Sequence, residues 1–470
     1  MSLSPNTQAI VVATHQVTTR GRLQPLANVR VGGISLLKRA LLTLAKEGIR
    51  NFAVVYADAS VEDQARQDDK LAALDIRWIQ NASRASEDGF SVLEALPNVQ
   101  DPYLVVPCDR VFDAQIVRTL LQQSSGSMTL AVSGEARKPL AEAGLSRIGE
   151  YSSRIVRTDA HSGFTGLFVA NRELGRALKA AEVDGRPLHL GRILSEVPAH
   201  RMHEVDVGGS FFESAVRPAG RERADQHLLA SLRKDVDGLV ARHVNRVFSL
   251  AVTRLIKNTP IRPNHVTAFS LGISIFAAFA AAHASSDAPW WLFFGAVLWQ
   301  LASMLDGVDG ELARLKFAGS KLGEWFDTLT DDIGKFAFFV GSGVGASSVY
   351  GNSMWTTLAV VTVAIQITLS VRIYRKLLGT GSGSHYALTW DTGDKAPTGW
   401  SKFTSKFEFF SRRDSFVAIW LVLTAAGMVR FNLVLTGIVT LFVLANELIV
   451  PRQARQGFVP TQRHNSLPPG

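Results

Sequence analysis

Two patterns of hydrophobic and polar positions divide the chain. In residues 1–225 short apolar runs alternate with polar segments, as in soluble proteins, whereas residues 264–450 hold long apolar runs. The short runs of the first part predict strands at residues 8–13, 52–56, 76–79, 103–107 and 128–132. Amphipathic stretches between these runs predict helices. Strands that alternate with helices indicate a doubly wound, parallel α/β sheet.

The second part predicts a bundle of membrane-spanning helices. Its apolar runs give six candidate spans, at residues 264–284, 289–312, 328–347, 354–374, 415–430 and 431–450. Each is near the ~20 residues that cross ~30 Å of hydrocarbon. We therefore predict a soluble α/β domain over residues 1–223, an all-α, six-helix transmembrane domain over residues 263–451, and a disordered tail over residues 452–470.

The segment between these parts, residues 224–262, predicts an amphipathic juxtamembrane helix. Its apolar stripe consists of Val236, Leu239, Val240, Val244, Val247, Ala251 and Leu255. Its cations lie mostly away from that stripe and are Arg233, Lys234, Arg242, Arg246, Arg254 and Lys257. Apolar residues on one face and cations on the other favour a helix on the surface of an anionic membrane. The alternative is an ordinary surface helix packed on the soluble domain.

The formal net charge of +9 is distributed unevenly around the predicted spans. The connections on one side carry a single basic residue, Arg430, whereas the opposite side carries many lysines and arginines. The positive-inside rule then predicts a multi-pass protein of the cell (inner) membrane, with the soluble domain and the C-terminus in the cytoplasm. We interpret the basicity as membrane-facing and expect no nucleic-acid partner, because the sequence lacks a basic-aromatic recognition motif.

Two further features bear on the compartment. The single cysteine, Cys108, excludes an intrachain disulfide and a cysteine-rich zinc site, and it suits a reducing compartment. Residues 1–25 are polar, so we expect no cleavable signal, and the first span directs insertion.

The candidate chemistry lies in residues 306–331, which read DGVDGELARLKFAGSKLGEWFDTLTD. One face of a first helix would present Asp306, Asp309, Gly310, Ala313 and Arg314. One face of a second helix would present Asp327 and Asp331. Carboxylates near membrane depth are costly unless they bind a cation, so this window predicts a metal site. The alternative, an acidic solvated turn between two spans, leaves Gly310 and Gly323 unexplained, because glycine inside a helix costs about 1 kcal/mol.

The spacing D-x-x-D-G-x-x-A-R-x8-G-x3-D-x3-D resembles the signature of the CDP-alcohol phosphotransferases at every motif position. The segment P-N-H-V-T at residues 263–267 also resembles that family. The resemblance implies that an acceptor hydroxyl attacks a CDP-alcohol and CMP leaves. It implies Mg²⁺ or Mn²⁺ held by Asp306, Asp309, Asp327 and Asp331, with Asp331 as the general base. It also implies contacts to CDP from Gly310, Ala313, Arg314 and Gly323, and a homodimer within the lipid bilayer.

The resemblance implies that the acceptor is an alcohol or an alcohol phosphate. Arginines suited to a phosphate lie near two predicted span ends, at Arg372, Arg375, Arg412 and Arg413. They are equally well explained as topology signals. Residues 379–400 are rich in Gly, Ser and Thr and predict a mobile loop.

Three alternatives to this function remain open. Within the same class, the donor would be CDP-diacylglycerol. In a different class, the chain would be a cation transporter, because intramembrane aspartates also mark ion pathways. A regulatory membrane anchor for the soluble domain would make no use of the four aspartates.

The soluble part resembles the nucleotidyltransferases over about residues 8–215. Arg22–Leu26 and the following GGISLLKRAL stretch match that family's pattern, and the resemblance implies metal-binding aspartates at Asp109 and Asp206. However, the family's glycine-rich phosphate loop reads ATHQVTTR here, at residues 13–20. We therefore predict that this domain does not supply the essential chemistry. Together the two parts resemble bifunctional inositol-phosphate cytidylyltransferase/di-inositol-phosphate phosphate synthase proteins. The alternative for this chain is therefore a bifunctional enzyme whose N-terminal cytidylyltransferase is active.

Overall fold

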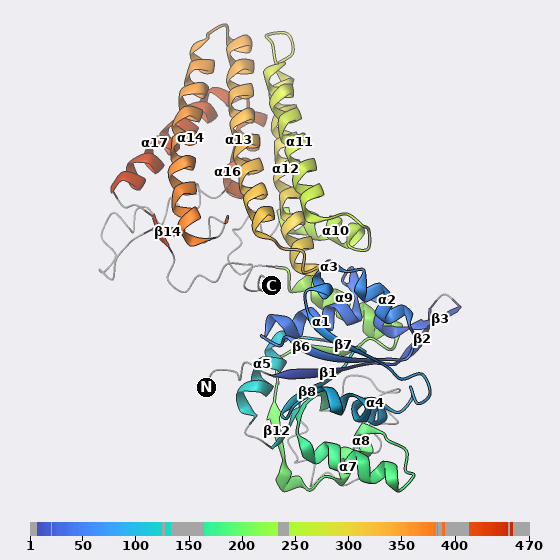
Figure 1. Ribbon diagram of the computed structural model, residues 1–470. Coiled ribbons are helices and arrows are strands. Elements are labelled where there is room, and N and C mark those ends of the chain that lie inside the picture. Colours follow the sequence, from blue (N-terminus) through green and yellow to red (C-terminus); the bar gives the residue numbers. More distant parts are fainter. Residues whose placement is uncertain are drawn as a thin grey trace. The chain divides into compact units, whose positions relative to one another are not determined.

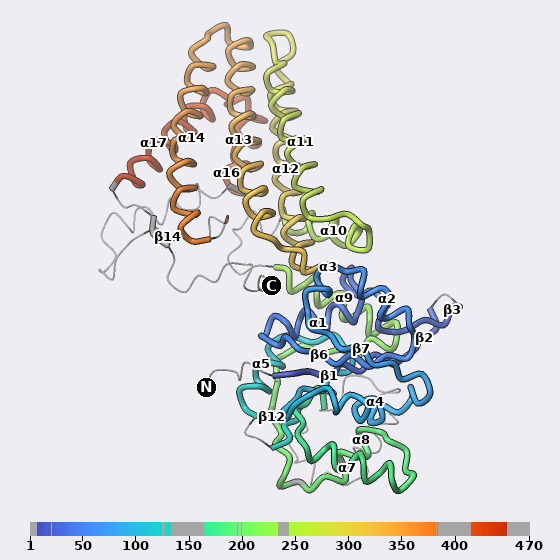
Figure 2. Tube along the Cα trace, in the orientation of Figure 1, coloured from blue at the N-terminus to red at the C-terminus, as the bar shows by residue number. Residues whose placement is uncertain are grey.

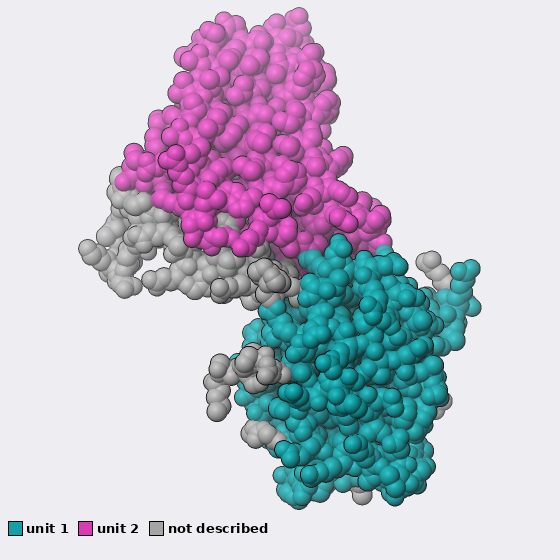
Figure 3. Space-filling model, in the orientation of Figure 1, with its two compact units in different colours: residues 1–228, 467–470 teal, residues 229–466 magenta. Residues whose placement is uncertain are grey.

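The computed structural model separates into two compact units, residues 1–228 with 467–470 and residues 229–466 (Figure 3). It describes residues 7–19, 21–124, 127–132, 164–233, 244–381, 383, 388–390, 413–449 and 452–454. The candidate Arg412 lies outside the described residues, and the side chain of Arg413 is not described.

The first unit is built on a seven-stranded sheet with the order β12-β10-β11-β8-β1-β6-β7 (Figure 1). Its strands, in chain order, are β1 Gln8–Ala13, β6 Asn51–Tyr56, β7 Asp75–Gln80, β8 Tyr103–Pro107, β10 Met128–Val132, β11 Phe164–Ala170 and β12 Met202–Asp206. The strands β8, β1, β6 and β7 are parallel, as predicted. Strand β11 is antiparallel to both neighbours, so the sheet is mixed and the prediction of a wholly parallel sheet is wrong. An apolar run predicts a strand but not its direction, which depends on the connection that precedes it.

Helices cover both faces of this sheet. The helices α4 Asp88–Ala95, α7 Arg172–Val183 and α8 Leu190–Glu196 contribute to one buried apolar cluster with β1, β6 and β8. On the other side lie α1 Leu36–Lys46 and α9 Pro218–Ala230, with the short helices α2 Ser60–Arg66 and α3 Asp69–Ala72 (Figure 1). Ser35 begins α1 by accepting a hydrogen bond from the Lys38 amide. The helix α5 Ala114–Gln123 packs beside α1.

Short strand pairs complete the first unit. The hairpin β2 Gln16–Thr19 and β3 Arg22–Pro25 turns at Gly21, whose φ of 76° favours glycine. The pair β4 Arg30–Val31 and β5 Ile34–Ser35 precedes α1. The strand β9 Arg110–Phe112 follows β8 in the chain and pairs antiparallel with β13 Phe212–Ser214.

The second unit is a helical bundle (Figure 2). Its helices are α10 Arg246–Ile256, α11 Pro263–Ala282, α12 Trp290–Leu315, α13 Lys321–Tyr350, α14 Met354–Thr380, α16 Arg413–Ala425 and α17 Val429–Ile449. The helix α11 packs against both α12 and α13, and α14 packs against α13 and α17. Trp299, Phe338, Phe339 and Trp420 stack in the interior and join α12, α13 and α16.

Four of these helices are long and apolar enough to cross a membrane: α11, α12, α14 and residues Val429–Leu448 of α17. The predicted count of six spans is not confirmed within the described residues. The helix α16 is apolar but has 13 residues. The helix α13 has 30 residues, but its first half carries charged side chains, among them Asp327, Asp331, Asp332 and Lys335.

The helix predicted over residues 224–262 is interrupted in the described residues, and residues 234–243 of that prediction lie outside them. The helix α9 ends at Ala230, a turn follows, and α10 begins at Arg246. Val247 and Leu255 of the predicted apolar stripe are 61% and 80% exposed, whereas the polar Ser249 and Thr253 are buried. The apolar periodicity could not reveal why Ser249 and Thr253 are buried, which is that a buried carboxylate on α12 binds their two hydroxyls.

Two other predictions concern the C-terminal part. Residues 388–390 of the predicted loop form β14, Leu388–Trp390, which pairs with β15, Arg452–Ala454. The tail that was predicted to be disordered therefore begins with a strand. The sequence did not predict this strand, because a polar segment gives no sign of the distant segment with which its backbone pairs. The rest of the tail lies outside the described residues.

Candidate metal centre and active site

A hairpin of two helices brings three aspartates together. Asp306 and Asp309 lie near the end of α12, and Asp327 lies in the second turn of α13. Ser320 begins α13 by accepting a hydrogen bond from the Gly323 amide at 3.0 Å. Each of the three aspartates offers one carboxylate oxygen, and these oxygens lie within 4.8 Å of one another. The convergence agrees with the prediction that the two helices build one site.

Three carboxylates so close together repel one another unless a cation lies among them. Asp309 is only 6% exposed, so water screens its charge poorly. Oxygen donors from carboxylates are the ligands that hard divalent cations prefer. The side chains of Asp306, Asp309 and Asp327 therefore fit a divalent metal ion.

Asp309 is held in place from a third helix. The Thr267 hydroxyl, on α11, donates a hydrogen bond to Asp309 Oδ2. Thr267 is itself 5% exposed, so this bond is shielded from solvent. The sequence placed Thr267 in a family-like segment but did not assign it a contact to the site. Its place in that segment was the only signal for this role.

Asp331 stands apart from the three converging oxygens. It lies one turn beyond Asp327 on α13 and is half-buried. Its role as ligand or base stays a prediction. The next residue, Asp332, is buried and accepts hydrogen bonds from Ser370 Oγ at 2.6 Å, Tyr374 Oη at 2.6 Å and Lys335 Nζ at 2.7 Å. Asp332 therefore joins α13 to α14 as a structural carboxylate.

The residues expected to contact CDP lie on the same hairpin. A Cβ at Gly310 would meet only Arg314 Nη1, at 3.4 Å, so the backbone there is accessible. A Cβ at Gly323 would approach Ser320 Oγ to 3.0 Å and Asn264 Oδ1 to 3.3 Å, so local crowding also accounts for that glycine. Arg314 Nη2 donates to the carbonyl of Leu232 at 3.3 Å, and Ala313 is half-buried.

Two of the four predicted acceptor arginines have side chains that the structure describes. Arg372 and Arg375 lie near the end of α14 and are exposed. The neighbouring Lys376 forms an ion pair with Glu447 of α17, which is 1% exposed. Lys376 therefore stabilises the bundle.

In the first unit, Asp109 follows β8 and is 2% exposed. Neither of its carboxylate oxygens accepts a hydrogen bond from the described residues, and the Nε atom of Arg110 lies 3.9 Å from Oδ1. Asp206, at the end of β12, is exposed and accepts a hydrogen bond from the Gly208 amide at 2.8 Å. Asp109 and Asp206 lie at the carboxyl ends of β8 and β12, which run in the same direction. The strands β11 and β10 lie between β8 and β12 in the sheet.

The neighbouring Cys108 is a buried thiol. Its side chain is 2% exposed, and burial raises the pKa of the thiol well above its usual value, with the Asp109 charge adding to the shift. The hairpin β2–β3 occupies the position of the expected glycine-rich phosphate loop.

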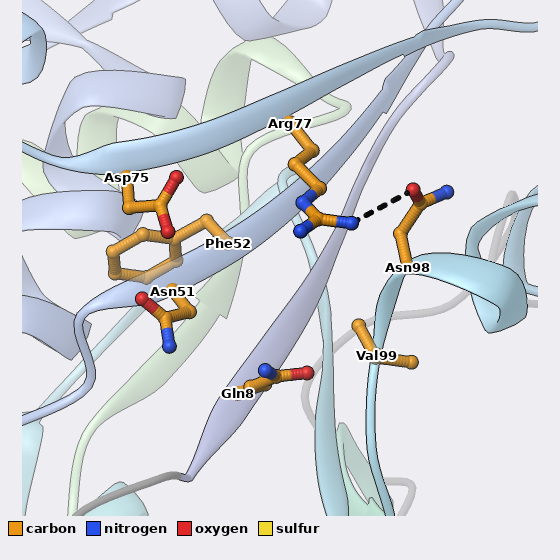
Figure 4. Close-up of a pocket in the computed structure, with 7 residues that line it drawn as sticks. All are labelled: Gln8, Asn51, Phe52, Asp75, Arg77, Asn98 and Val99. Atoms are coloured by element: carbon orange, nitrogen blue, oxygen red, sulfur yellow. Dashed lines mark hydrogen bonds between the residues drawn. The ribbon is translucent and has the colours of Figure 1, made fainter.

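A cavity of about 80 Å³ lies elsewhere in the first unit (Figure 4). It is lined by Gln8, Asn51, Phe52, Asp75, Arg77, Asn98 and Val99. Gln8, Asn51 and Asp75 are the first residues of β1, β6 and β7. Ligands of such sheets bind at the carboxyl ends of the strands, so this cavity is not the nucleotide site.

Comparison with known proteins divides the chain at the same place. Residues 261–400 match the CDP-alcohol phosphatidyltransferase family, and residues 20–200 match the MobA-like NTP transferase domain. The bifunctional IPC transferase and DIPP synthase of Rubrobacter xylanophilus is 30% identical over 338 residues, which cover 70% of this chain and 74% of that protein. The protein of that name from Aquifex aeolicus is 25% identical and covers 67% of this chain and 71% of its own.

A relative with a different name matches a shorter stretch of the chain. The phosphatidylinositol phosphate synthase of Mycobacteroides abscessus is 28% identical over 151 residues, which are 32% of this chain and 64% of that protein. The two long matches cover both units, so both resemblances expected from the sequence are confirmed. The chain belongs to the family of bifunctional IPC transferase and DIPP synthase proteins and joins a nucleotidyltransferase domain to a CDP-alcohol phosphotransferase domain.

Proposed function

We propose that the aspartates of α12 and α13 catalyse the transfer of a substituted phosphate from a CDP-alcohol to an acceptor hydroxyl, with CMP as the leaving group. The observation that carries this proposal is the convergence of the Asp306, Asp309 and Asp327 oxygens within 4.8 Å. Family membership supports the reaction class. A phosphotransferase site also accounts for the buried aspartates, so a cation transporter is not needed to explain them.

Asp306, Asp309 and Asp327 hold Mg²⁺ or Mn²⁺. When bound, the cation neutralises charge on the diphosphate of the donor. The CDP portion of the donor contacts Gly310, Ala313, Arg314 and Gly323. At Gly310 the absence of a side chain leaves the helix backbone accessible to it. Thr267 keeps Asp309 oriented through its hydrogen bond.

Asp331 is the general base. It accepts the proton of the acceptor hydroxyl, whose oxygen bonds to the phosphorus that carries the donor alcohol. The bond between that phosphorus and the CMP oxygen breaks in the same exchange. A half-buried carboxylate one turn from the metal ligands suits this role, because it lies near the site and outside the converging group.

The names of the long relatives suggest the substrates. IPC transferase and DIPP synthase activities point to a CDP-linked inositol as donor and an inositol phosphate as acceptor. Arg372, Arg375, Arg412 and Arg413 are then the candidates for the acceptor phosphate, since guanidinium groups bind phosphate bidentately. The name of the shorter relative favours the alternative donor, CDP-diacylglycerol.

The alternative to a first unit without catalytic activity is cytidylyl transfer in that unit. The specific observation is Asp109, a carboxylate 2% exposed that accepts no hydrogen bond from the described residues. A buried carboxylate in this state is stabilised when a cation binds it. Asp109, with Asp206 as a more distant candidate, would hold the divalent ion of a nucleoside triphosphate. The glycine-poor loop at residues 13–20 argues against this activity, because it lacks the glycines that bring backbone amides to a triphosphate. Asp109 therefore predicts an active cytidylyltransferase, and the loop predicts an inactive one.

The enzyme functions in the cell (inner) membrane as a homodimer, with its first unit and C-terminus in the cytoplasm. Four helices long and apolar enough to span a bilayer support the membrane location. The exposed apolar residues Val244, Val247, Phe248 and Leu255 on and beside α10 support an interfacial position for that helix.

The test is CMP release by the purified full chain with inositol phosphate and either CDP-inositol or CDP-diacylglycerol. We expect Mg²⁺-dependent release from CDP-inositol and its loss in Asp309→Asn. Asp287→Asn is the matched control, because Asp287 is exposed in the connection before α12. Release from CDP-diacylglycerol alone would favour the lipid reaction. Release from neither donor would refute the proposal.

A further inference from the structure

The helix α12 carries another buried carboxylate within the acidic window. Glu311 is 0% exposed and lies two residues after Asp309. It accepts hydrogen bonds from Arg246 Nη1 at 2.8 Å, Ser249 Oγ at 2.6 Å and Thr253 Oγ1 at 2.6 Å. All three donors come from α10, at the three- and four-residue spacing that places them on one helix face. One carboxylate therefore joins two helices through three hydrogen bonds.

Gly307 lets α10 come this close. A Cβ at Gly307 would lie 3.3 Å from Ser249 Cβ, which is tighter than ordinary contact, and 3.6 Å from Arg246 Nη1, which is ordinary contact. Gly307 and Glu311 are four residues apart, so they share the face of α12 that meets α10. Asp306, Asp309 and Gly310 lie in the same two turns as Gly307 and Glu311. The same two turns of helix thus present the metal ligands on one face and the α10 contact on another.

We propose that Glu311 is a positioning residue: its bonds to α10 hold this part of α12 in register and thereby set the affinity of the site for its divalent cation. The inference rests on the proposed role of Asp306 and Asp309. Glu311 itself contacts neither metal nor substrate. Both of its carboxylate oxygens accept hydrogen bonds from α10, so its charge is used for fixing α12.

The arrangement predicts a specific defect when the charge is removed. Glu311→Gln removes the carboxylate charge that pairs with the Arg246 guanidinium, whose side chain is 12% exposed. The helices retain their apolar contact, because Val252 and Ile256 of α10 pack against Val308 and Leu312 of α12. The expected result is a folded bundle in which the turn bearing Asp306 and Asp309 is less well fixed.

The experiment measures the Mg²⁺ concentration for half-maximal CMP release and the binding of Mn²⁺, with thermal unfolding of each variant in detergent. Glu311→Gln and Arg246→Gln should each raise the half-saturating Mg²⁺ concentration about 10–100-fold, as for residues that orient metal ligands. The double variant should be no worse than either single variant, because the two residues act as one unit. Ser249→Ala with Thr253→Val keeps both charges and should shift the same parameter less.

The matched control is Glu447→Gln. Glu447 is also a buried carboxylate paired with a cation, Lys376, but it joins α14 to α17. This variant should lower the unfolding temperature and leave the half-saturating Mg²⁺ concentration unchanged.

Two outcomes overturn the inference. One is wild-type Mg²⁺ dependence in a folded Glu311→Gln protein. The other is an equal shift in Glu447→Gln, which would mean that any lost ion pair in the bundle has this effect. Failure of the proposed function looks different, because the wild-type protein itself would then release no CMP. Should Glu311→Gln not fold, the Ser249→Ala, Thr253→Val variant decides by the same criterion.

Discussion

The bond from Thr267 to Asp309 gives the sharpest quantitative prediction. Thr267→Val replaces a hydroxyl by a methyl group of nearly the same size, so the helix packing is kept. The two residues are 5% and 6% exposed, so water does not replace the lost donor. A hydrogen bond to a charged group contributes about 1.5–3 kcal/mol, and a tenfold change in affinity corresponds to about 1.4 kcal/mol. Metal affinity should therefore fall about 10–100-fold.

The assay is the Mg²⁺ dependence of CMP release together with Mn²⁺ binding. Thr267→Ser keeps the hydroxyl and should retain most of the affinity. Thr436→Val is the matched control, because Thr436 is a buried threonine of α17 whose hydroxyl donates only to the carbonyl of Asn432. If Thr267→Val binds metal as the wild type does, the hydrogen bond does not orient Asp309 and the reasoning is wrong.

Three further predictions concern the other candidate residues. Asp331→Asn should lower CMP release about 10²–10⁴-fold while Mn²⁺ still binds, whereas Asp306→Asn should lose both; equal loss of binding would make Asp331 another ligand. Asp109→Asn should leave phosphotransfer from preformed CDP-alcohol intact, and loss of CTP-dependent pyrophosphate release in the same variant would assign cytidylyl transfer to the first unit. Burial raises the Cys108 pKa, which lowers the thiolate fraction at pH 8, so iodoacetamide should label Cys108 only after unfolding; rapid labelling of the folded protein would contradict its burial.

The sequence predicted the parts of the site that follow from helical spacing. Asp306 and Asp309 share a helix face by their three-residue separation, and residues 316–320 are too short to carry the next helix far away. Convergence with Asp327 follows from these two facts. The strands β1, β6 and β8 were likewise predictable, because each is a short apolar run between turn residues.

What the sequence could not predict are contacts between distant elements. Thr267 and Asp309 are 42 residues apart, and Ser249 and Glu311 are 62 apart. On α10 the apolar pattern pointed to Val247 and Leu255 as part of a membrane-facing stripe, and both side chains are exposed. It gave no information on the opposite face, where Ser249 and Thr253 bind the carboxylate on α12. Periodicity reports the apolar face of one helix and not the polar contacts that its other face makes.

The central claim is that Asp306, Asp309 and Asp327 together hold a divalent cation. Its most direct test is the titration of the purified full chain with Mn²⁺, followed by electron paramagnetic resonance, for the wild type, Asp309→Asn and Asp287→Asn. We expect saturable binding that Mg²⁺ displaces in the wild type and in Asp287→Asn, and a loss of that binding in Asp309→Asn. Equal Mn²⁺ binding by the wild type and by a folded Asp309→Asn protein would contradict the claim.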